Sequence, residues 1–194
     1  MTVTTTPDTR DRILDVAQRL LQTRGFNGVS YADIAAELGI TKAALHYHFP
    51  AKTDLGLAVL ERYAEAFAAA LRDIDERHPR AVDRLRAYAA LYIDVLEGER
   101  LCLCAMLAAE QRTLDPSLRQ AVDAFFAANV VWLTELVRRG RRDGTLAGVG
   151  PPAAVADLLL GALEGALLVA WSRDDLEGFR RTTRQLVASL TPAR

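Results

Sequence analysis

The chain has 194 residues, 51% of them hydrophobic, and a formal net charge of −1. This length allows one large domain or two small ones, each with a core that needs no disulfides. The charge excludes a protein that is basic throughout, which would be the simplest sign of nucleic-acid binding.

The first residues, MTVTTTPDT, lack a basic stretch followed by an apolar one, so they do not resemble a signal peptide and are expected to form a disordered arm. The first helix is predicted over residues 9–24. Ile13, Ala17, Leu20 and Leu21 recur on one face of it, and Gly25 follows as its C-cap.

Residues 30–55 predict two short helices joined by a tight turn, at 31–38 and 42–48. Ser30 and Asp33 have the spacing of a capping box for the first helix. Gly39 provides a residue that tolerates a positive φ at the turn. Thr41 is placed to cap the second helix, and Pro50 follows its end.

The second short helix has a clear inside and outside. Leu45 and Phe49 are four residues apart and are expected to face inward. The side chains left facing outward are those of Lys42, Ala43, His46 and Tyr47. Two histidines at i and i+2 cannot share a metal ion on a helix, so no metal site is predicted here. This is the pattern of a helix-turn-helix, whose second helix enters a DNA major groove.

Charge within this segment points two ways. Acidic residues slightly outnumber basic ones over residues 1–70, which argues weakly against DNA binding. However, the only two lysines of the chain, Lys42 and Lys52, both lie at predicted helix starts, where backbone N–H groups also favour phosphate. We give more weight to this placement.

The remainder of the chain predicts six more helices, giving an all-α fold of about nine helices. We expect them at residues 51–77, 80–97, 101–112, 116–139, 152–172 and 175–190, with Gly140 ending the 116–139 helix.

The segment LCLCAMLAAE at residues 101–110 resembles a pocket wall, because Leu, Cys and Met are apolar and adaptable. Together with nearby aromatic residues it predicts a pocket for an apolar or aromatic ligand, with few polar groups facing inward. The predicted lining comprises Tyr88, Tyr92, Cys102, Met106, Phe125, Phe126, Trp132 and Trp171. Ordinary core packing is the alternative. Another alternative is that Cys102 or Cys104 senses oxidants or electrophiles as a thiolate.

The helix expected at 152–172 is apolar nearly all round, so it must be buried on several sides. Gly161 and Gly165 would let another helix approach closely, and with Leu168 they form the predicted dimer interface. The alternative is a central helix of the monomer core. Its apolar stretch, 155–171, is interrupted by two acids and is short for a membrane span, so no membrane partner is predicted.

The stretch from about Arg10 to Tyr63 resembles the TetR family of transcriptional repressors. The resemblance rests on RDRILDVAQRLLQTRGF, NGVSYADIAAELGI, TKAALHYHF and PAKTDL. It implies a helix-turn-helix DNA-binding domain at residues 1–50, with the motif at 31–49, and an effector-binding and dimerisation domain at 51–194. It also implies a phosphate contact for the aromatic residue Tyr47 and a phosphate clamp for Lys52. Ala51 departs from the pattern, because the family usually has Ser, Asn or Asp there.

The resemblance implies a cytoplasmic homodimer that binds a near-palindromic DNA operator and leaves it when a small apolar or aromatic effector binds, without any cofactor. The predicted DNA contacts are Ser30, Thr41, Lys42, Ala43, His46, Tyr47 and Lys52. The alternative is a thiol- or partner-regulated repressor of the same fold. An all-α enzyme is the remote alternative, since the sequence has no nucleophile–base–acid set and no metal-ligand spacing.

Overall fold

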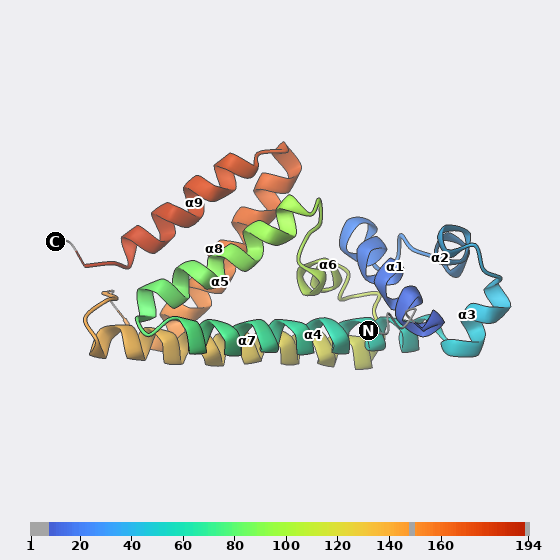
Figure 1. The fold of residues 1–194 in the computed structure, drawn as a ribbon, viewed down its shortest axis with the longest axis horizontal. Coiled ribbons are helices and arrows are strands. Elements are labelled where there is room, and N and C mark those ends of the chain that lie inside the picture. Colours follow the sequence, from blue (N-terminus) through green and yellow to red (C-terminus); the bar gives the residue numbers. More distant parts are fainter. Residues whose placement is uncertain (1–7, 148–149, 193–194) are drawn as a thin grey trace, which may run out of the picture. The chain divides into compact units, whose positions relative to one another are not determined.

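The structure is a computed structural model that describes residues 8–147 and 150–192; most of the expected N-terminal arm therefore lies outside the described residues. Within these ranges the chain forms nine α-helices and no strand, which confirms the all-α prediction (Figure 1). The helices are α1 (Thr9–Arg24), α2 (Tyr31–Leu38), α3 (Lys42–His48), α4 (Lys52–Arg77), α5 (Ala81–Glu97), α6 (Leu103–Ala109), α7 (Pro116–Arg142), α8 (Pro152–Arg173) and α9 (Leu176–Ser189).

The chain divides into two compact units. The first unit comprises residues 1–63 and 103–122, and the second comprises 64–102 and 123–194. Helices α4 and α7 therefore contribute residues to both units. The functional boundary predicted at residue 50 remains a prediction, because compactness alone does not report which residues bind DNA or effector.

The first unit is built around α1, which packs on α2 and on α6, while α2 packs on α3. Its core consists of aliphatic side chains from three of these helices, including Ile13, Leu20, Ile34 and Leu45, each at most 1% exposed. The apolar side chains that recur along the sequence therefore face inward. Burial of each such side chain stabilises the unit by about 1.5–3 kcal/mol.

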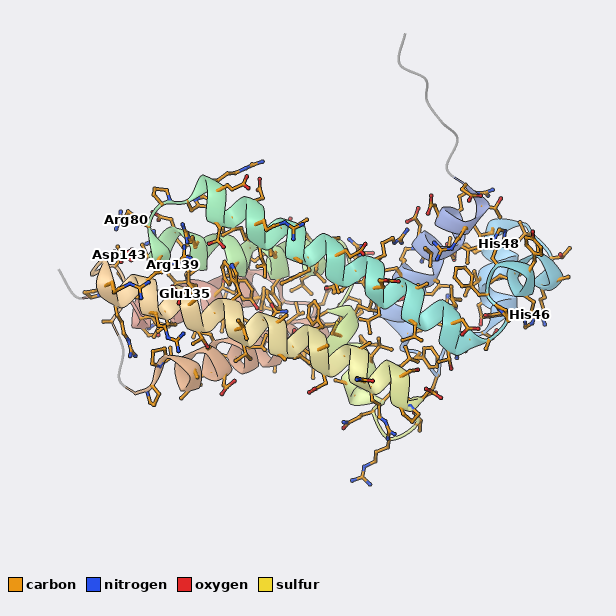
Figure 2. The ribbon with its side chains drawn as sticks, turned by 90° about the horizontal axis from the view of Figure 1, so that it is seen from below. His46, His48, Arg80, Glu135, Arg139 and Asp143 are labelled. Atoms are coloured by element: carbon orange, nitrogen blue, oxygen red, sulfur yellow. The ribbon has the colours of Figure 1, made fainter. Side chains whose placement is uncertain are left out.

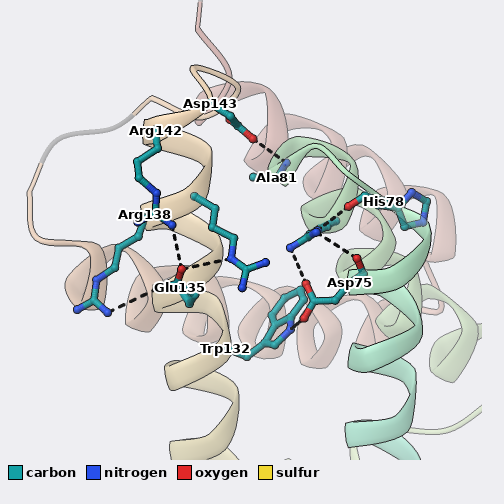
Figure 3. Close-up of polar contacts among 10 residues, drawn as sticks. Asp75, His78, Ala81, Trp132, Glu135, Arg138, Arg142 and Asp143 are labelled. Atoms are coloured by element: carbon teal, nitrogen blue, oxygen red, sulfur yellow. Dashed lines mark hydrogen bonds and ion pairs between the residues drawn. The ribbon is translucent and has the colours of Figure 1, made fainter.

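The second unit contains α5, α8 and α9 packed on one another, together with the adjoining parts of α4 and α7 (Figure 1). The corner between α4 and α5 is fixed by the nearly buried Arg84. Its guanidinium pairs with the Asp75 carboxylate at 2.7 Å and donates to the His78 carbonyl at 2.6 Å. Asp75 also accepts a hydrogen bond from the Trp132 indole of α7 at 2.9 Å (Figure 3). These charge-assisted bonds join three helices at one point.

Helix α7 ends later than predicted, at Arg142 rather than at Arg139. Gly140 is a helical residue, and its role is close approach: a Cβ there would lie 2.5 Å from the Leu146 side chain. The Leu146 N–H donates to the Gly140 carbonyl at 2.9 Å, and Gly144, with φ +70°, makes the turn. The helix end is neutralised by Glu135, whose carboxylate contacts Arg139 and Arg142 (Figure 3).

Helix α6 is shorter than the predicted 101–112 and covers only Leu103–Ala109. Beyond its last residue the backbone continues in tight turns, with the Thr113 N–H donating to the Glu110 carbonyl at 2.9 Å. Cys102 therefore precedes the helix and Cys104 lies within it, and both are buried thiols.

Candidate nucleic-acid interface

The polar face of α3 is open, as the sequence predicted. Leu45 and Phe49 are buried, whereas Lys42, Ala43 and His46 are exposed. Tyr47 is 84% exposed, although a large aromatic side chain gains most from burial. Its ring contacts only one neighbouring ring among those described, the edge of His48 at a centroid distance of 5.3 Å. The fold therefore does not account for an aromatic residue at position 47.

Local capping explains why this helix pair forms. The Ser30 hydroxyl accepts from the Asp33 N–H at 3.3 Å, and the Asp33 carboxylate accepts from the Ser30 N–H at 2.7 Å, which completes the predicted capping box. The Ser30 hydroxyl also donates to the Asp33 carboxylate at 2.5 Å, and this bond, followed by the one from the Ser30 N–H, lowers the pKa of Asp33. Thr41 caps α3 by accepting from the Ala44 N–H at 3.1 Å, and Gly39 adopts a left-handed φ of +66° between the helices.

His46 lies at the end of α3 (Figure 2), where two contacts orient its ring. Its Nδ1 lies 3.2 Å from the Pro50 carbonyl oxygen, and because that oxygen can only accept, Nδ1 carries the proton. Its ring lies against that of Tyr31, whose hydroxyl donates to the Phe49 carbonyl at 2.8 Å. Burial, followed by the nearby Asp54 carboxylate, raises the pKa of Tyr31 to about 12, so this hydroxyl stays a donor at physiological pH. The exposed Nε2 of His46 is thereby held in one direction.

Lys52 has a structural role that the sequence did not predict. Its ammonium donates to the Phe26 carbonyl and lies 4.4 Å from the centre of the Phe26 ring. Partial burial lowers the pKa of Lys52, and the Glu110 carboxylate opposes that shift. Lys52 therefore anchors the loop after α1, and its contact with phosphate remains a prediction.

The missing cap at Ala51 is partly replaced from within α4. The Asp54 carboxylate accepts a hydrogen bond from the Ala51 N–H at 2.9 Å, which is the returning half of a capping box. The departure from the family pattern therefore leaves the start of α4 intact.

Glu110 is an important residue of this unit that sequence reasoning missed. Its carboxylate accepts from the Phe26 N–H at 2.6 Å and from the Asn27 N–H at 3.2 Å. Gly25, with φ +76°, brings the backbone close enough, because a Cβ there would lie 2.7 Å from Glu110 Oε1. The partners are 84 residues apart in the chain, so no local signal pointed to this contact.

The predicted effector pocket lies mainly in the second unit, and part of it is a cluster of touching rings. Tyr88 stacks on Trp132 at a centroid distance of 5.3 Å and contacts Tyr92 at 5.5 Å. Phe125 contacts Phe126 at 5.6 Å and the unpredicted Phe67 at 5.2 Å. The ring contacts of the described residues do not include Trp171, which is half-buried near the end of α8, and Met106 belongs to the first unit.

The sequence predicts that few polar groups face inward, and the structure shows two polar side chains at this cluster. Asn129, 2% exposed, accepts from the Tyr88 hydroxyl at 3.0 Å and donates to the Phe125 carbonyl at 2.9 Å. The two carboxyl oxygens of Glu164 are also buried. Glu164 is one of two acids in the apolar stretch of α8, and helical periodicity does not show which way its side chain points.

A separate groove in the second unit lies between α5 and α9, with a volume of about 750 Å³. Its lining includes Arg86, Ile93, Arg184 and Val187. None of the predicted pocket residues lines this groove.

Residues 13–59 match the family described as "Bacterial regulatory proteins, tetR family", and residues 81–186 match "Tetracyclin repressor-like, C-terminal domain". The chain belongs to the TetR family. A TetR-family regulator from Agrobacterium tumefaciens has a structure that superposes with a TM-score of 0.91 at 31% identity, covering 94% of this chain and 97% of the other. The transcriptional repressor NemR of Escherichia coli K12 is 26% identical over 196 residues, 96% of each chain. The structure of E. coli NemR in its reduced form has a TM-score of 0.82 at 26% identity, covering 96% of this chain and all of the other.

TetR-family proteins are transcription factors, so the chain is a DNA-binding transcriptional repressor rather than an enzyme. The family also resolves the question of a membrane. Contrary to the expectation from the sequence, α8 is long and apolar enough to cross a bilayer, as is α7. The apolar stretch 155–171 is only part of α8, and the whole helix spans 22 residues. Because the family is one of DNA-binding regulators, these two helices do not indicate a membrane span.

Proposed function

We propose that this TetR-family protein is a homodimer that binds a near-palindromic operator through the α3 helices of its two copies. The observation that carries the proposal is the exposed face of α3, where Lys42, His46 and Tyr47 are accessible on a helix whose other face is buried. Thr41 and Ser30 lie at the N-termini of α3 and α2, where N–H groups favour phosphate. We assign DNA binding to residues 1–50.

The proposed dimer interface is the outer face of α8. Gly161 and Gly165 have nothing within 4 Å of the position that a Cβ would take, and Leu168 is 58% exposed. Leu158, at 65% exposed, continues the same face three residues before Gly161. An apolar stripe with small residues at its centre suits a second copy of the helix. Two recognition helices would then read half-sites about 34–36 Å apart.

Substitution in α3 tests the DNA contacts. Lys42→Ala is expected to weaken operator binding and to reduce the slope of log affinity against log salt concentration by about one unit, because one phosphate contact is lost. Tyr47→Phe should weaken binding if the hydroxyl bonds a phosphate. Both side chains are exposed, so the melting temperature should not change. Fluorescence anisotropy at several salt concentrations measures the effect, and an unchanged affinity and slope would remove Lys42 from the interface.

We further propose that residues 51–194 bind a small, mainly apolar or aromatic effector near the ring cluster of the second unit, and that binding lowers operator affinity. Apolar burial should give a negative heat-capacity change. Linkage requires the operator to weaken effector binding by the same factor. A thermal-shift screen followed by a DNA-release assay tests this idea.

The alternative is thiol regulation through Cys102 or Cys104, and the relative NemR has a structure described as its reduced form. Both thiols are at most 3% exposed, so an oxidant has to enter the core to reach them. If no compound both stabilises the protein and releases DNA, while an oxidant releases DNA from the wild type but not from the Cys102→Ser or the Cys104→Ser variant, thiol regulation replaces the effector.

A further inference from the structure

Glu164 is a buried acid that the proposed mechanism does not use. It lies in the middle of α8, and both of its carboxyl oxygens are shielded from solvent without a hydrogen bond of normal geometry to any described residue. The nearest polar groups that affect it are the Tyr92 hydroxyl and the Cys102 thiol. Burial is the main reason that the pKa of Glu164 is raised well above its usual value. A leucine would fill this position at lower cost, so fold stability does not explain an acid here.

The hydrogen atoms of the neighbouring polar groups are already committed. The Asn129 amide nitrogen donates to the Phe125 carbonyl, which leaves its oxygen as the acceptor for the Tyr88 hydroxyl. The Tyr88 hydroxyl has one proton and donates it to the Asn129 side-chain oxygen. Tyr92 must therefore be the donor in the 3.1 Å bond between the two hydroxyls. This chain of donors runs away from Glu164.

The end of this hydrogen-bond chain near Glu164 is therefore rich in acceptors, and the Cys102 thiol, a weak donor, is the donor that remains beside the carboxyl group. The hydroxyl oxygen of Tyr92 and both carboxyl oxygens of Glu164 have lone pairs that can accept further hydrogen bonds. The rings of Tyr88 and Tyr92 belong to this site, because the hydroxyls of both interact electrostatically with Glu164, and Tyr88 is stacked on Trp132. Ring faces carry a partial negative charge and attract cations. A ligand that complements this environment supplies N–H donors and a positive charge.

We propose that Glu164 and the Tyr92 hydroxyl oxygen form the polar anchor of the effector site, and that the effector carries a protonated amine on an aromatic or apolar body. The inference rests on the proposed function, because it names the chemical class of the ligand at that site. The ammonium pairs with the Glu164 carboxylate and donates to Tyr92, while the body of the ligand lies among the rings. Since α5 and α8 pack directly on each other, a ligand inserted between Tyr92 of α5 and Glu164 of α8 has to separate them, which couples binding to a change of conformation.

Matched ligands test the proposal on the full-length protein. The probes are 2-phenylethylamine with 2-phenylethanol, and 1-naphthylmethylamine with 1-naphthalenemethanol, which differ only in the charged amine. Calorimetric titration is expected to show that the wild type binds each amine at least tenfold more tightly than the matching alcohol, as for a hydrogen bond to a charged group. Glu164→Gln should remove this preference and leave the affinity for the alcohols within about twofold.

Control variants separate the anchor from a general effect on the fold. Glu76→Gln removes an exposed acid of the same unit and should retain the preference for amines. Circular dichroism checks that Glu164→Gln is folded, and Glu164→Leu provides a second neutral variant if it is not. If alcohols bind as tightly as amines and Glu164→Gln changes nothing, the anchor is disproved while an apolar effector survives. If no probe of either kind binds, while other apolar compounds release DNA, the anchor is also disproved. If no compound of any kind releases DNA, the anchor and the effector site fail together.

Discussion

A chain that carries both Gly161→Leu and Gly165→Leu is expected to sediment as a monomer and to lose at least about a hundredfold in operator affinity. The loss follows because a monomer engages one half-site, so it forgoes the effective concentration that links the two recognition helices in a dimer. Within one copy of the chain, nothing lies within 4 Å of the position of either Cβ, so the new side chains have room and the fold itself should be retained. Analytical ultracentrifugation and DNA binding measured on the same preparation provide the test.

The matched control replaces both glycines with alanine. Alanine adds one carbon, which a close helix pair tolerates far better than leucine, and it stabilises a helix by roughly 0.5–1 kcal/mol per site relative to glycine. The alanine variant is expected to remain dimeric and to melt at a higher temperature. A leucine variant that still forms dimers with unchanged dissociation would move the interface away from this face of α8.

Replacing Glu110 with alanine should destabilise the first unit by about 2–4 kcal/mol, because two backbone N–H groups lose a charged acceptor. These groups belong to Phe26 and Asn27, in the loop that leads from α1 into the helix-turn-helix. Lys52 donates to the Phe26 carbonyl in the same loop, so the loop is held from both sides. Loosening it should weaken operator binding, even though Glu110 is not proposed to touch DNA.

Hydrogen exchange is the suitable measurement, because both tryptophans lie in the second unit and do not report on the first. Amides of α1 and α2 are expected to lose protection in Glu110→Ala, while those of α9 keep theirs. Glu110→Gln retains an acceptor without the charge and should have an intermediate effect. The exposed neighbour provides the control: Gln111→Ala should leave exchange unchanged. Equal protection in Glu110→Ala and the wild type would show that the loop is held by other contacts.

The sequence alone determined the features that depend on neighbours within a few residues. Ser30 and Asp33 form the predicted capping box, Thr41 caps α3, and Gly39 has the positive φ that the turn requires. The inward position of Leu45 and the outward position of Lys42 followed from helical periodicity. The resemblance to the family could also be inferred from residues 30–55, because the capping residues, the turn glycine and the apolar spacing follow one another directly in the sequence.

Local reasoning failed where a distant segment changed the role of a residue. Gly140 matched the pattern of a helix end, but it lies inside α7 because Leu146 packs against it. The ammonium of Lys52 donates to the Phe26 carbonyl, 26 residues away, a contact that no local pattern indicated, while its phosphate contact stays a prediction. A short sequence pattern identifies the side chain at a position. The partners of that side chain depend on which distant segments the fold brings next to it.

Only the tertiary structure showed the polar interior of the second unit. Glu164 lies on an apolar helix, and its sequence gives no indication whether the carboxyl reaches solvent or the core. The fold packs α5 against α8, and the Tyr92 hydroxyl donates to Tyr88, the Tyr88 hydroxyl donates to Asn129, and the Asn129 amide donates to the Phe125 carbonyl. The free energy of a buried acid depends on which donors remain near it, and that is decided by helices far apart in sequence that meet in the core.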